Sequence, residues 1–362
     1  MTKEISGSRL SAPSVTSGRS LAIDVIKALC IILMVVGHSG APADLEKMIS
    51  SFHIPAFFIV SGFLLKPDYT ADLRGFARKR MKSIWWPFVF WTIVFILLHN
   101  AFAYLQLYPE PYAPKEFAHH LIKGILMLST EQLLGGFWFL VSLLFASVFS
   151  ILWLRITRFT RAGILGGIGL CLLLTVVLSG GLLPEFLYFN SHNFFSTAFF
   201  LTGTFMAREK LQLTTRRKAV VAGAIVSLVI GTFWIRRAIT NITPEMTLPY
   251  YLTATFITWG LIIVFWRLPS EGFWRYLAMI GSRTLDILIF HFLTFKVITW
   301  LRVTPGSLPA SALSEFPVPG FPEVMQDSGW FWLVYSLAGI SIPLLLSVGK
   351  DRLNRLLGIR IP

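Results

Sequence analysis

Two histidines and one lysine lie in strongly apolar segments near the start of the chain, namely Lys27, His38 and His53. Charged and titratable side chains are costly in an apolar environment, so these positions are candidates for function. Imidazole gains and loses a proton near neutral pH, which suits it to acid–base chemistry. We expect His53 to lie near His38 because a short loop separates the two segments. A metal site is not predicted, since no third ligand stands in a suitable position.

The spacing of Lys27 and His38 is close to a whole number of helical turns. They are eleven residues apart, which at about 3.6 residues per turn is close to three turns, so both should project from one face about 16 Å apart along the axis. Asp24 precedes Lys27 by three residues and lies on nearly the same stripe. Asp24 and Lys27 form either one end of a functional stripe or an interfacial ion pair, and the second interpretation leaves His38 unexplained.

Four further polar side chains interrupt apolar segments and are expected to lie around this site. Arg283 and Asp286 are three residues apart, and we predict an ion pair between them. His291 lies deeper in the same segment and is expected to face a cavity from the second layer of residues. Ser61 follows His53 in its apolar segment and is assigned to the same supporting layer.

The composition indicates that membrane helices carry these side chains. Of 362 residues, 55% are hydrophobic and 14% are charged, and the mean hydropathy is +0.68, values that exclude an ordinary soluble or disordered protein. Cys30 and Cys171 lie in apolar runs and are expected to be small buried hydrophobes. The net charge of +14 is dispersed among apolar runs, so nucleic-acid binding is not indicated. No P-loop, dinucleotide-binding turn or zinc pattern is present, and no bound cofactor is predicted.

Ten apolar runs are about long enough to cross a bilayer, so the chain is predicted to be an all-α integral membrane protein with about ten transmembrane helices. Two of the runs, 52–65 and 193–206, are short for a full crossing. We expect residues 1–18 to form a flexible tail, 19–350 the membrane domain and 351–362 a short basic tail. The runs are 21–38, 52–65, 85–104, 137–154, 163–183, 193–206, 219–235, 250–266, 277–301 and 330–348.

The basic residues between these runs predict an orientation. With a cytoplasmic N-terminus, 23 Lys and Arg residues lie in inner segments and six in outer segments. This bias follows the positive-inside rule and places both termini in the cytoplasm. The two longest outer segments, 105–136 and 302–329, carry acidic residues and contain several prolines and glycines. They either cover a site that opens outward or are solvated connections.

Two blocks of the sequence resemble the membrane-bound acyltransferase family 3. The first is residues 21–27 leading to His38, with the family's spacing of one basic residue, ten residues and a histidine. The second is residues 52–64, and the stretches 80–87, 137–140 and 281–291 are also similar to the family. Within it, the chain is most similar to fucose O-acetylase-type enzymes and exopolysaccharide O-acetyltransferases. Many members carry Arg-x-x-Arg in the second inner segment, where this chain has Lys79 and Lys82, so bidentate binding of phosphate is lost there.

The resemblance implies a donor and a place for it. The donor would be acetyl-CoA from the cytoplasm, a polyanion that is a substrate and not a bound cofactor. Basic side chains of the second inner segment would attract its phosphates, although positive-inside anchoring explains them equally well. Lys27, kept positively charged by Asp24, would attract the donor or stabilise charge and would not act as a nucleophile. The residues assigned to donor binding are Arg78, Lys79, Arg80 and Lys82.

The resemblance also implies a saccharide acceptor, extracytoplasmic or lipid-linked, at a bacterial inner membrane, with polysaccharide assembly machinery as a further partner. The hydroxyl of such an acceptor needs a base to take its proton, and His38 is assigned to this role. Trp138 is assigned to stacking on a sugar ring, although a packing role is common for such residues. His192 and Asn193 are assigned to hydrogen bonding the acceptor, with a helix cap as the alternative. Two other functions stay open on the residues alone: a transporter or flippase of a glycan, and a structural membrane subunit. A proton-coupled carrier would need its ionisable groups near mid-membrane, whereas the two histidines are expected at one face.

Overall fold

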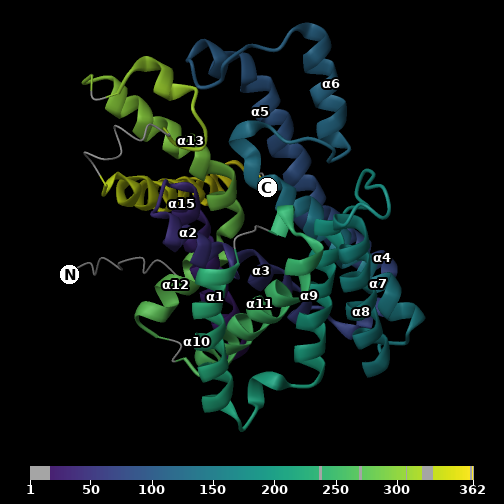
Figure 1. The fold of residues 1–362 in the computed structure, drawn as a ribbon. Helices are drawn as coiled ribbons and strands as arrows, with labels where there is room; N and C mark the ends of the chain where they lie inside the picture. Colours follow the sequence, from purple (N-terminus) through teal and green to yellow (C-terminus); the bar gives the residue numbers. More distant parts are fainter. Residues whose placement is uncertain are drawn as a thin grey trace, which may run out of the picture.

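The computed structural model describes residues 17–235, 239–268, 271–306, 308–319, 329–358 and 361, and within these ranges the secondary structure is helical, with one isolated β-bridge between Phe186 and Phe189 (Figure 1). The expected tail at residues 1–18 lies outside the described residues apart from its last two positions. The longer helices are α1 (Ser17–His38), α5 (Trp86–Tyr104), α7 (Trp138–Ile156), α8 (Arg161–Ser179), α9 (Ser191–Arg208), α10 (Arg217–Trp234), α11 (Pro244–Phe265), α13 (Thr284–Val303) and α15 (Phe331–Leu357). The shorter helices are α2 (Ala43–Ser50), α3 (His53–Phe63), α4 (Leu73–Arg80), α6 (Pro114–Ile125) and α12 (Phe273–Ser282).

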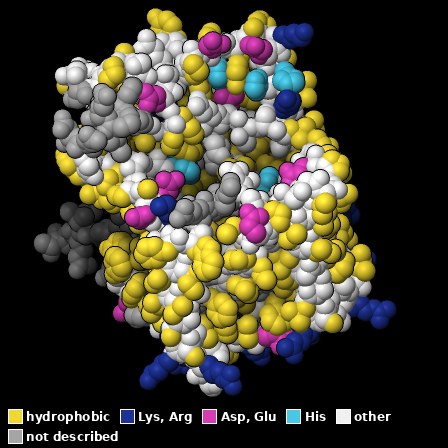
Figure 2. Space-filling view, in the orientation of Figure 1, with side chains coloured by type: hydrophobic (Ala, Val, Ile, Leu, Met, Phe, Trp, Pro, Cys, Tyr) yellow, Lys and Arg dark blue, Asp and Glu magenta, His cyan; other side chains and the backbone are white. Residues whose placement is uncertain are grey.

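The protein is an all-α integral membrane protein, as the sequence predicts. In the described part of the chain, eight helices are long and apolar enough to cross a membrane. Large apolar side chains cover the outside of the bundle, among them Phe233, 77% exposed, and Leu345, 71% exposed. Figure 2 shows this apolar surface over the lower part of the molecule, with histidine and acidic side chains gathered at the top, over α5 and α6.

The two short apolar runs form α3 and α9, which lie inside the bundle. Helix α3 has 11 residues, about 16 Å of helix, against a hydrocarbon core of about 30 Å. Gly62 of α3 and Gly203 of α9 lie at their crossing: a Cβ on Gly62 would lie 1.7 Å from the Phe200 carbonyl oxygen, and one on Gly203 would lie 1.8 Å from that of Ile59. Small residues permit such close helix crossings in membranes. Because the bundle buries α3 and α9, their length is not set by the thickness of the lipid.

One predicted span is wrong in its boundaries. The run 277–301 is two helices, α12 and α13, which are separated at Arg283. Arg283 has φ −114°, so it leaves the helical region, and α12 packs against α1. At the other end of the chain, α15 continues to Leu357, so residues expected as the start of a basic tail belong to its last two turns.

Two apolar clusters pack on either side of α1. The first joins α3, α8, α9 and α11 and includes the fully buried Phe199 and Tyr250. The second joins α5, α7 and α13 and includes the fully buried Phe295. Cys30 and Cys171 are buried free thiols in the first cluster, as predicted. Side chains of α1 enter both clusters, and the polar stripe of this helix lies between them.

The bundle has two ends that are named here by their short helices. At the α4 end lie the N-terminal parts of α1 and α13 and the C-terminal end of α3. At the α6 end lie His38 at the last residue of α1, His53 at the first residue of α3, and the starts of α7 and α9. The charge bias predicts that the α4 end faces the cytoplasm.

Candidate active site

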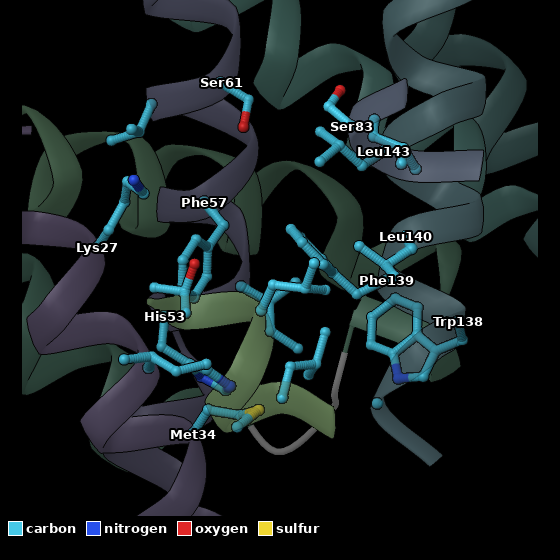
Figure 3. Close-up of a pocket in the computed structure, with 18 of the residues that line it drawn as sticks. Lys27, Met34, His53, Phe57, Ser61, Ser83, Trp138, Phe139, Leu140 and Leu143 are labelled. Atoms are coloured by element: carbon cyan, nitrogen blue, oxygen red, sulfur yellow. The ribbon is translucent and has the colours of Figure 1, made fainter. Parts of the chain in front are cut away.

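A cavity of about 240 Å³ runs through the bundle between α1, α3, α7 and α13. Helix α1 lines it with Lys27, Ile31, Met34 and His38, whose spacing of four, three and four residues defines a single helical face. Lys27 and His38 therefore share one face, as their spacing predicts. Figure 3 shows Lys27, Ser61 and Ser83 at one end of the cavity and Met34, His53 and Trp138 at the other.

His53 is held in a defined orientation at the α6 end of the cavity. Its side chain is 7% exposed, and its Nδ1 lies 2.6 Å from the backbone carbonyl oxygen of Ile49. Since a carbonyl oxygen only accepts, Nδ1 carries the proton and donates it, and Nε2 of the neutral ring keeps its lone pair. His53 thus offers a hydrogen-bond acceptor to a molecule in the cavity.

His38 lies against a second histidine from a distant part of the chain. Its ring centroid is 5.8 Å from that of His291, with 27° between the ring planes, and 5.1 Å from that of Phe292. His291 is fully buried, and its Nδ1 donates to the carbonyl oxygens of Ile287 and Leu288 at 3.0 Å. Its Nε2 has no hydrogen-bond partner among the described residues. His291 is not among the residues that line the cavity, and its ring packs on that of His38, which does line it.

The α4 end of the cavity is polar. Lys27 Nζ lies 2.8 Å from Asp24 Oδ1, and the two side chains are 26% and 28% exposed. Ser61, Ser83 and Thr284 complete this end. Ser83 belongs to a π-helical turn, Met81–Trp85, between α4 and α5, and such turns often occur at functional sites. The sequence carries no signal for Ser83 or Thr284, because their direction depends on this widened turn and on the break before α13.

The four basic residues assigned to donor binding lie beside this polar end. Arg78, Lys79 and Lys82 are exposed, and Arg80 is half-buried with its guanidinium 5.2 Å from the Phe76 ring. None of the four is among the described residues that line the cavity. Lys82 directly precedes Ser83, so the exposed cations stand next to the α4 end of the cavity.

The residues assigned to the acceptor surround a second hollow, here called the outer pocket, of about 200 Å³ at the α6 end. Trp138 lines both the cavity and the outer pocket, and its ring meets His192 edge-on at 6.1 Å. Asn193 also lines the pocket, but its amide is engaged within the protein: its Oδ1 accepts from Ser142 Oγ at 2.6 Å, and its Nδ2 donates to the Tyr188 carbonyl at 2.8 Å. Asn193 therefore shapes the pocket wall.

The predicted ion pair between Arg283 and Asp286 is wrong, since no such pair occurs in the described part of the chain. Arg283 pairs with Asp351 at 2.8 Å, and Asp286 pairs with Lys350 at 2.5 Å. Both also hydrogen-bond Ser347 Oγ, at 2.6 Å and 2.5 Å respectively. Because Arg283 stands at the break before α13, the three-residue spacing does not bring the two side chains together, and both tie α13 to α15.

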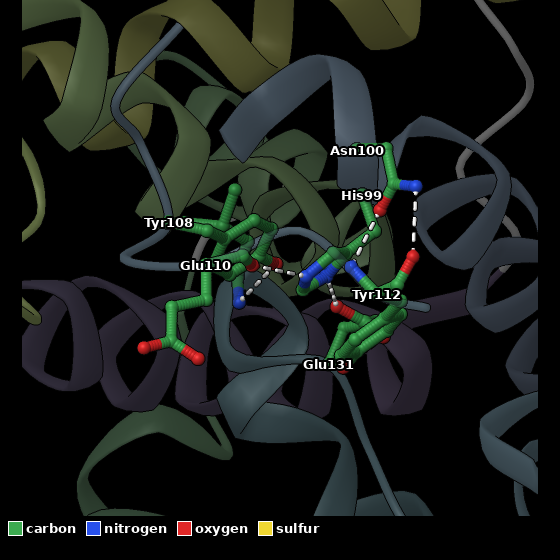
Figure 4. Close-up of polar contacts among 7 residues, drawn as sticks. His99, Asn100, Tyr108, Glu110, Tyr112 and Glu131 are labelled. Atoms are coloured by element: carbon green, nitrogen blue, oxygen red, sulfur yellow. Dashed lines mark hydrogen bonds and ion pairs between the residues drawn. The ribbon is translucent and has the colours of Figure 1, made fainter. Parts of the chain in front are cut away.

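The two long segments at the α6 end are packed against the bundle in the parts that the structure describes. The first is held by His99 of α5, which is 4% exposed. Its Nδ1 lies 2.9 Å from Glu131 Oε2, and its Nε2 lies 3.1 Å from the Glu110 carbonyl oxygen (Figure 4). Its ring stacks between Tyr108 at 4.3 Å and Tyr112 at 3.4 Å. Glu131 directly precedes the turn Gln132–Phe137, which lines the cavity at Gly136.

The second segment is held by a buried lysine. Lys296 is 1% exposed, and its Nζ donates to the carbonyl oxygens of Leu313, at 2.8 Å, and of Glu315. Phe316 packs on Phe292 with ring centroids 4.6 Å apart. The cation of Lys296 is thus used to fasten this segment over α13.

The family model of an acyltransferase domain matches residues 20–348. The chain belongs to this acyltransferase family. The matched range contains each residue that lines the cavity, from Lys27 to Leu288. Comparison with curated proteins and with solved structures returned no match. The protein is therefore a membrane acyltransferase, and the cavity through the middle of the acyltransferase domain is its candidate active site.

Proposed function

We propose that this acyltransferase is an O-acetyltransferase that moves acetyl from cytoplasmic acetyl-CoA to a hydroxyl of an extracytoplasmic or lipid-linked saccharide, as in exopolysaccharide modification at a bacterial inner membrane. The observation that carries the proposal is the single cavity between Lys27 at the α4 end and His38 and His53 at the α6 end. A donor and an acceptor that approach from opposite ends meet inside it. No bound cofactor takes part in this scheme.

The α4 end suits the donor. Arg78, Lys79 and Lys82 offer charges to the phosphates of CoA outside the cavity, and Lys27 offers one at its mouth. The middle of the cavity is lined by apolar side chains such as Ile31, Met34 and Phe57. An uncharged, thin arm that ends in a thioester fits such a lining, and the apolar walls keep water away from the thioester. The same lining disfavours the transporter alternative, because a proton-coupled carrier needs ionisable groups at mid-depth.

The α6 end suits the chemistry. His38 accepts the hydrogen bond of the reacting hydroxyl and takes its proton as the oxygen attacks the thioester carbonyl carbon, and His53 Nε2 accepts a hydrogen bond from a second hydroxyl of the saccharide and so orients it. The new C–O bond forms, the C–S bond breaks, and the CoA thiolate leaves with the proton that His38 returns. His291 packs on the His38 ring and limits its rotation. Trp138 lies where the cavity meets the outer pocket and offers a stacking surface for a sugar.

The test is the O-acetyl content of surface polysaccharide in cells that carry wild type, His38→Ala, Lys27→Ala or a gene deletion, at matched membrane abundance. His119→Ala, an exposed histidine on α6, is the matched control. We expect ester to be lost in the deletion, His38→Ala and Lys27→Ala strains, while polymer output and the His119→Ala strain are unchanged. Unchanged ester in the deletion strain with reduced polymer export would contradict the proposed acceptor.

A further inference from the structure

An apolar groove of about 540 Å³, here called the lateral groove, lies on the outside of α7 and extends from the α6 end of the bundle toward Trp85, near the α4 end. Its floor is one face of α7. The side chains there follow one another at intervals of three, one, three, one and three residues, so they form a continuous stripe along the helix. Its walls come from the π-helical turn before α5, the end of α6 with the residues that follow it, and the loop before α9. The α7 residues are Val141, Leu144, Phe145, Val148, Phe149 and Leu152, and the wall residues are Trp85, Ile125, Leu126, Met127, Tyr188 and Phe189.

The groove has the length and exposure expected of a site for a lipid chain. Val141 and Leu152 are eleven residues apart, about 16 Å along α7, and half of a hydrocarbon core of about 30 Å is about 15 Å. Val148 is 40% exposed and Leu152 is 47% exposed. The groove therefore opens sideways to the lipid over about one leaflet.

Three hollows follow one another from the lipid to the histidines. The lateral groove and the outer pocket share Met127, Val141 and Tyr188. The outer pocket and the cavity share Trp138. The polarity of the lining changes in the same order. The groove is apolar, and the cavity ends at His38 and His53. The outer pocket between them adds the polar side chains of Ser129, Thr130, Asn190 and His192.

Tyr188 marks the boundary between the apolar and polar hollows. Its hydroxyl donates to the backbone carbonyl of Leu126 and so joins the loop before α9 to the turn after α6. Burial raises the pKa of this phenol, so the hydroxyl stays protonated and keeps the link. The Phe189 ring meets Phe145 edge-on at 5.8 Å and continues the apolar wall below the hydroxyl.

We propose that the lateral groove holds the hydrocarbon chain of an amphiphilic acceptor that enters sideways from the bilayer. Its polar head occupies the outer pocket, and one hydroxyl passes Trp138 to reach His38 and His53. The inference rests on the proposed transfer to a hydroxyl, and it selects a lipid-anchored acceptor over a soluble one. The sequence of apolar, polar and catalytic hollows matches the order of parts in such a molecule.

The test uses photolabelling, which does not depend on catalysis. The full-length protein is placed in phosphatidylcholine vesicles with a polyprenyl diphosphate hexose that carries a diazirine in its isoprenoid chain. We expect labelling of the α7 peptide between Val141 and Leu152, competed by the unlabelled polyprenyl diphosphate hexose and not by free hexose or excess phosphatidylglycerol. Val148→Trp fills the groove and should reduce labelling at least about fivefold. The matched control, Leu173→Trp on the exposed face of α8, 59% exposed in wild type, should leave it unchanged.

Equal competition by ordinary phospholipid would assign the groove to bulk lipid, and crosslinks between two protein chains would assign it to a second copy; either result overturns the inference. Unchanged labelling in Val148→Trp does the same. Transfer of acetyl from acetyl-CoA is measured separately in the same vesicles. If labelling follows the expected pattern but no acetyl reaches any acceptor, the proposed function fails while the groove retains its lipid chain. If acetyl reaches a soluble glycoside as readily as the lipid-linked hexose, the function stands and the groove inference fails.

Discussion

Gly281 of α12 touches the backbone of Asp24 on α1 so closely that a Cβ at position 281 would lie 1.7 Å from the Asp24 carbonyl oxygen. The neighbouring backbone of Ala28 is 3.1 Å from the same point. Asp24 forms the ion pair with Lys27. The close contact between α12 and α1 at Gly281 therefore determines the position of this ion pair in the bundle. The site at the α4 end of the cavity therefore depends on a glycine that has no side chain to contribute.

Gly281→Ala should push α12 away from α1, because a backbone atom cannot move aside as a flexible side chain can. Overpacking of this kind costs about 1–3 kcal/mol. We expect a lower thermal midpoint in detergent and weaker acyl transfer, since Lys27 shifts with α1. Gly169→Ala on α8 is the control, because its Cβ would meet nothing within 4 Å. Equal midpoints for the two variants would show that the α1–α12 contact yields easily.

His38 and Lys27 should affect different kinetic constants of the purified enzyme. If His38 is the base, His38→Ala lowers kcat about 10²- to 10⁴-fold and leaves the KM for acetyl-CoA near that of wild type. Lys27→Met should raise this KM. Lys27→Arg should bring the KM most of the way back to the wild-type value, because the attraction of the donor depends on the positive charge. Initial rates in proteoliposomes with varied acetyl-CoA provide both constants. A His38→Ala enzyme with wild-type kcat would remove His38 from the mechanism.

Glu131→Gln should loosen the segment over the α6 end of the cavity. Both ring nitrogens of His99 face acceptor oxygens, and Glu131 is 3% exposed, so the variant leaves a buried polar group without its charged partner. Removal of one member of a buried pair costs about 3–5 kcal/mol. Thermal unfolding in detergent measures the loss, with the exposed Glu110→Gln as control, since His99 contacts only the Glu110 backbone. A wild-type midpoint for Glu131→Gln would mean that the pair contributes little.

Alkaline pH should destabilise the same segment through Tyr108. Burial, and after it the Glu131 carboxylate, raises the pKa of Tyr108 above its usual value, about 10. The folded state then keeps a proton that the unfolded state releases, so this contribution to stability is complete below about pH 10 and is lost as the pH rises through the higher folded pKa. Tyr108→Phe removes the titrating group, and the fall of the thermal midpoint between about pH 9 and 11 should become shallower. Tyr104→Phe, at a position 89% exposed, should keep the wild-type slope.

The sequence by itself determined the class of fold and the stripe on α1. Apolar runs of membrane length identify helices because hydrocarbon excludes unsatisfied backbone groups. The shared face of Lys27 and His38 follows from the helical period, which depends on local geometry alone. The same reasoning placed His53 at the start of α3 and predicted that Cys30 and Cys171 are buried.

Local periodicity failed where a residue lies at a break or depends on a partner far along the chain. Arg283 and Asp286 are three residues apart, yet the break at Arg283 directs both to α15, more than sixty residues later. The burial of His99 does not follow from its own segment, because its partner Glu131 is 32 residues away. Ser83 reaches the cavity only through a π-helical turn that sequence spacing does not reveal.

Tertiary structure alone decided what surrounds the polar stripe. His291 lies against His38 although 253 residues separate them, and α3 and α9 are internal because Gly62 and Gly203 let their backbones meet. The cavity, the outer pocket and the lateral groove are spaces between helices, and their connection through Trp138 and Tyr188 depends on how those helices pack. A sequence pattern records which face of each helix is apolar, but it does not record which faces meet, because that choice is made by the packing of the whole bundle.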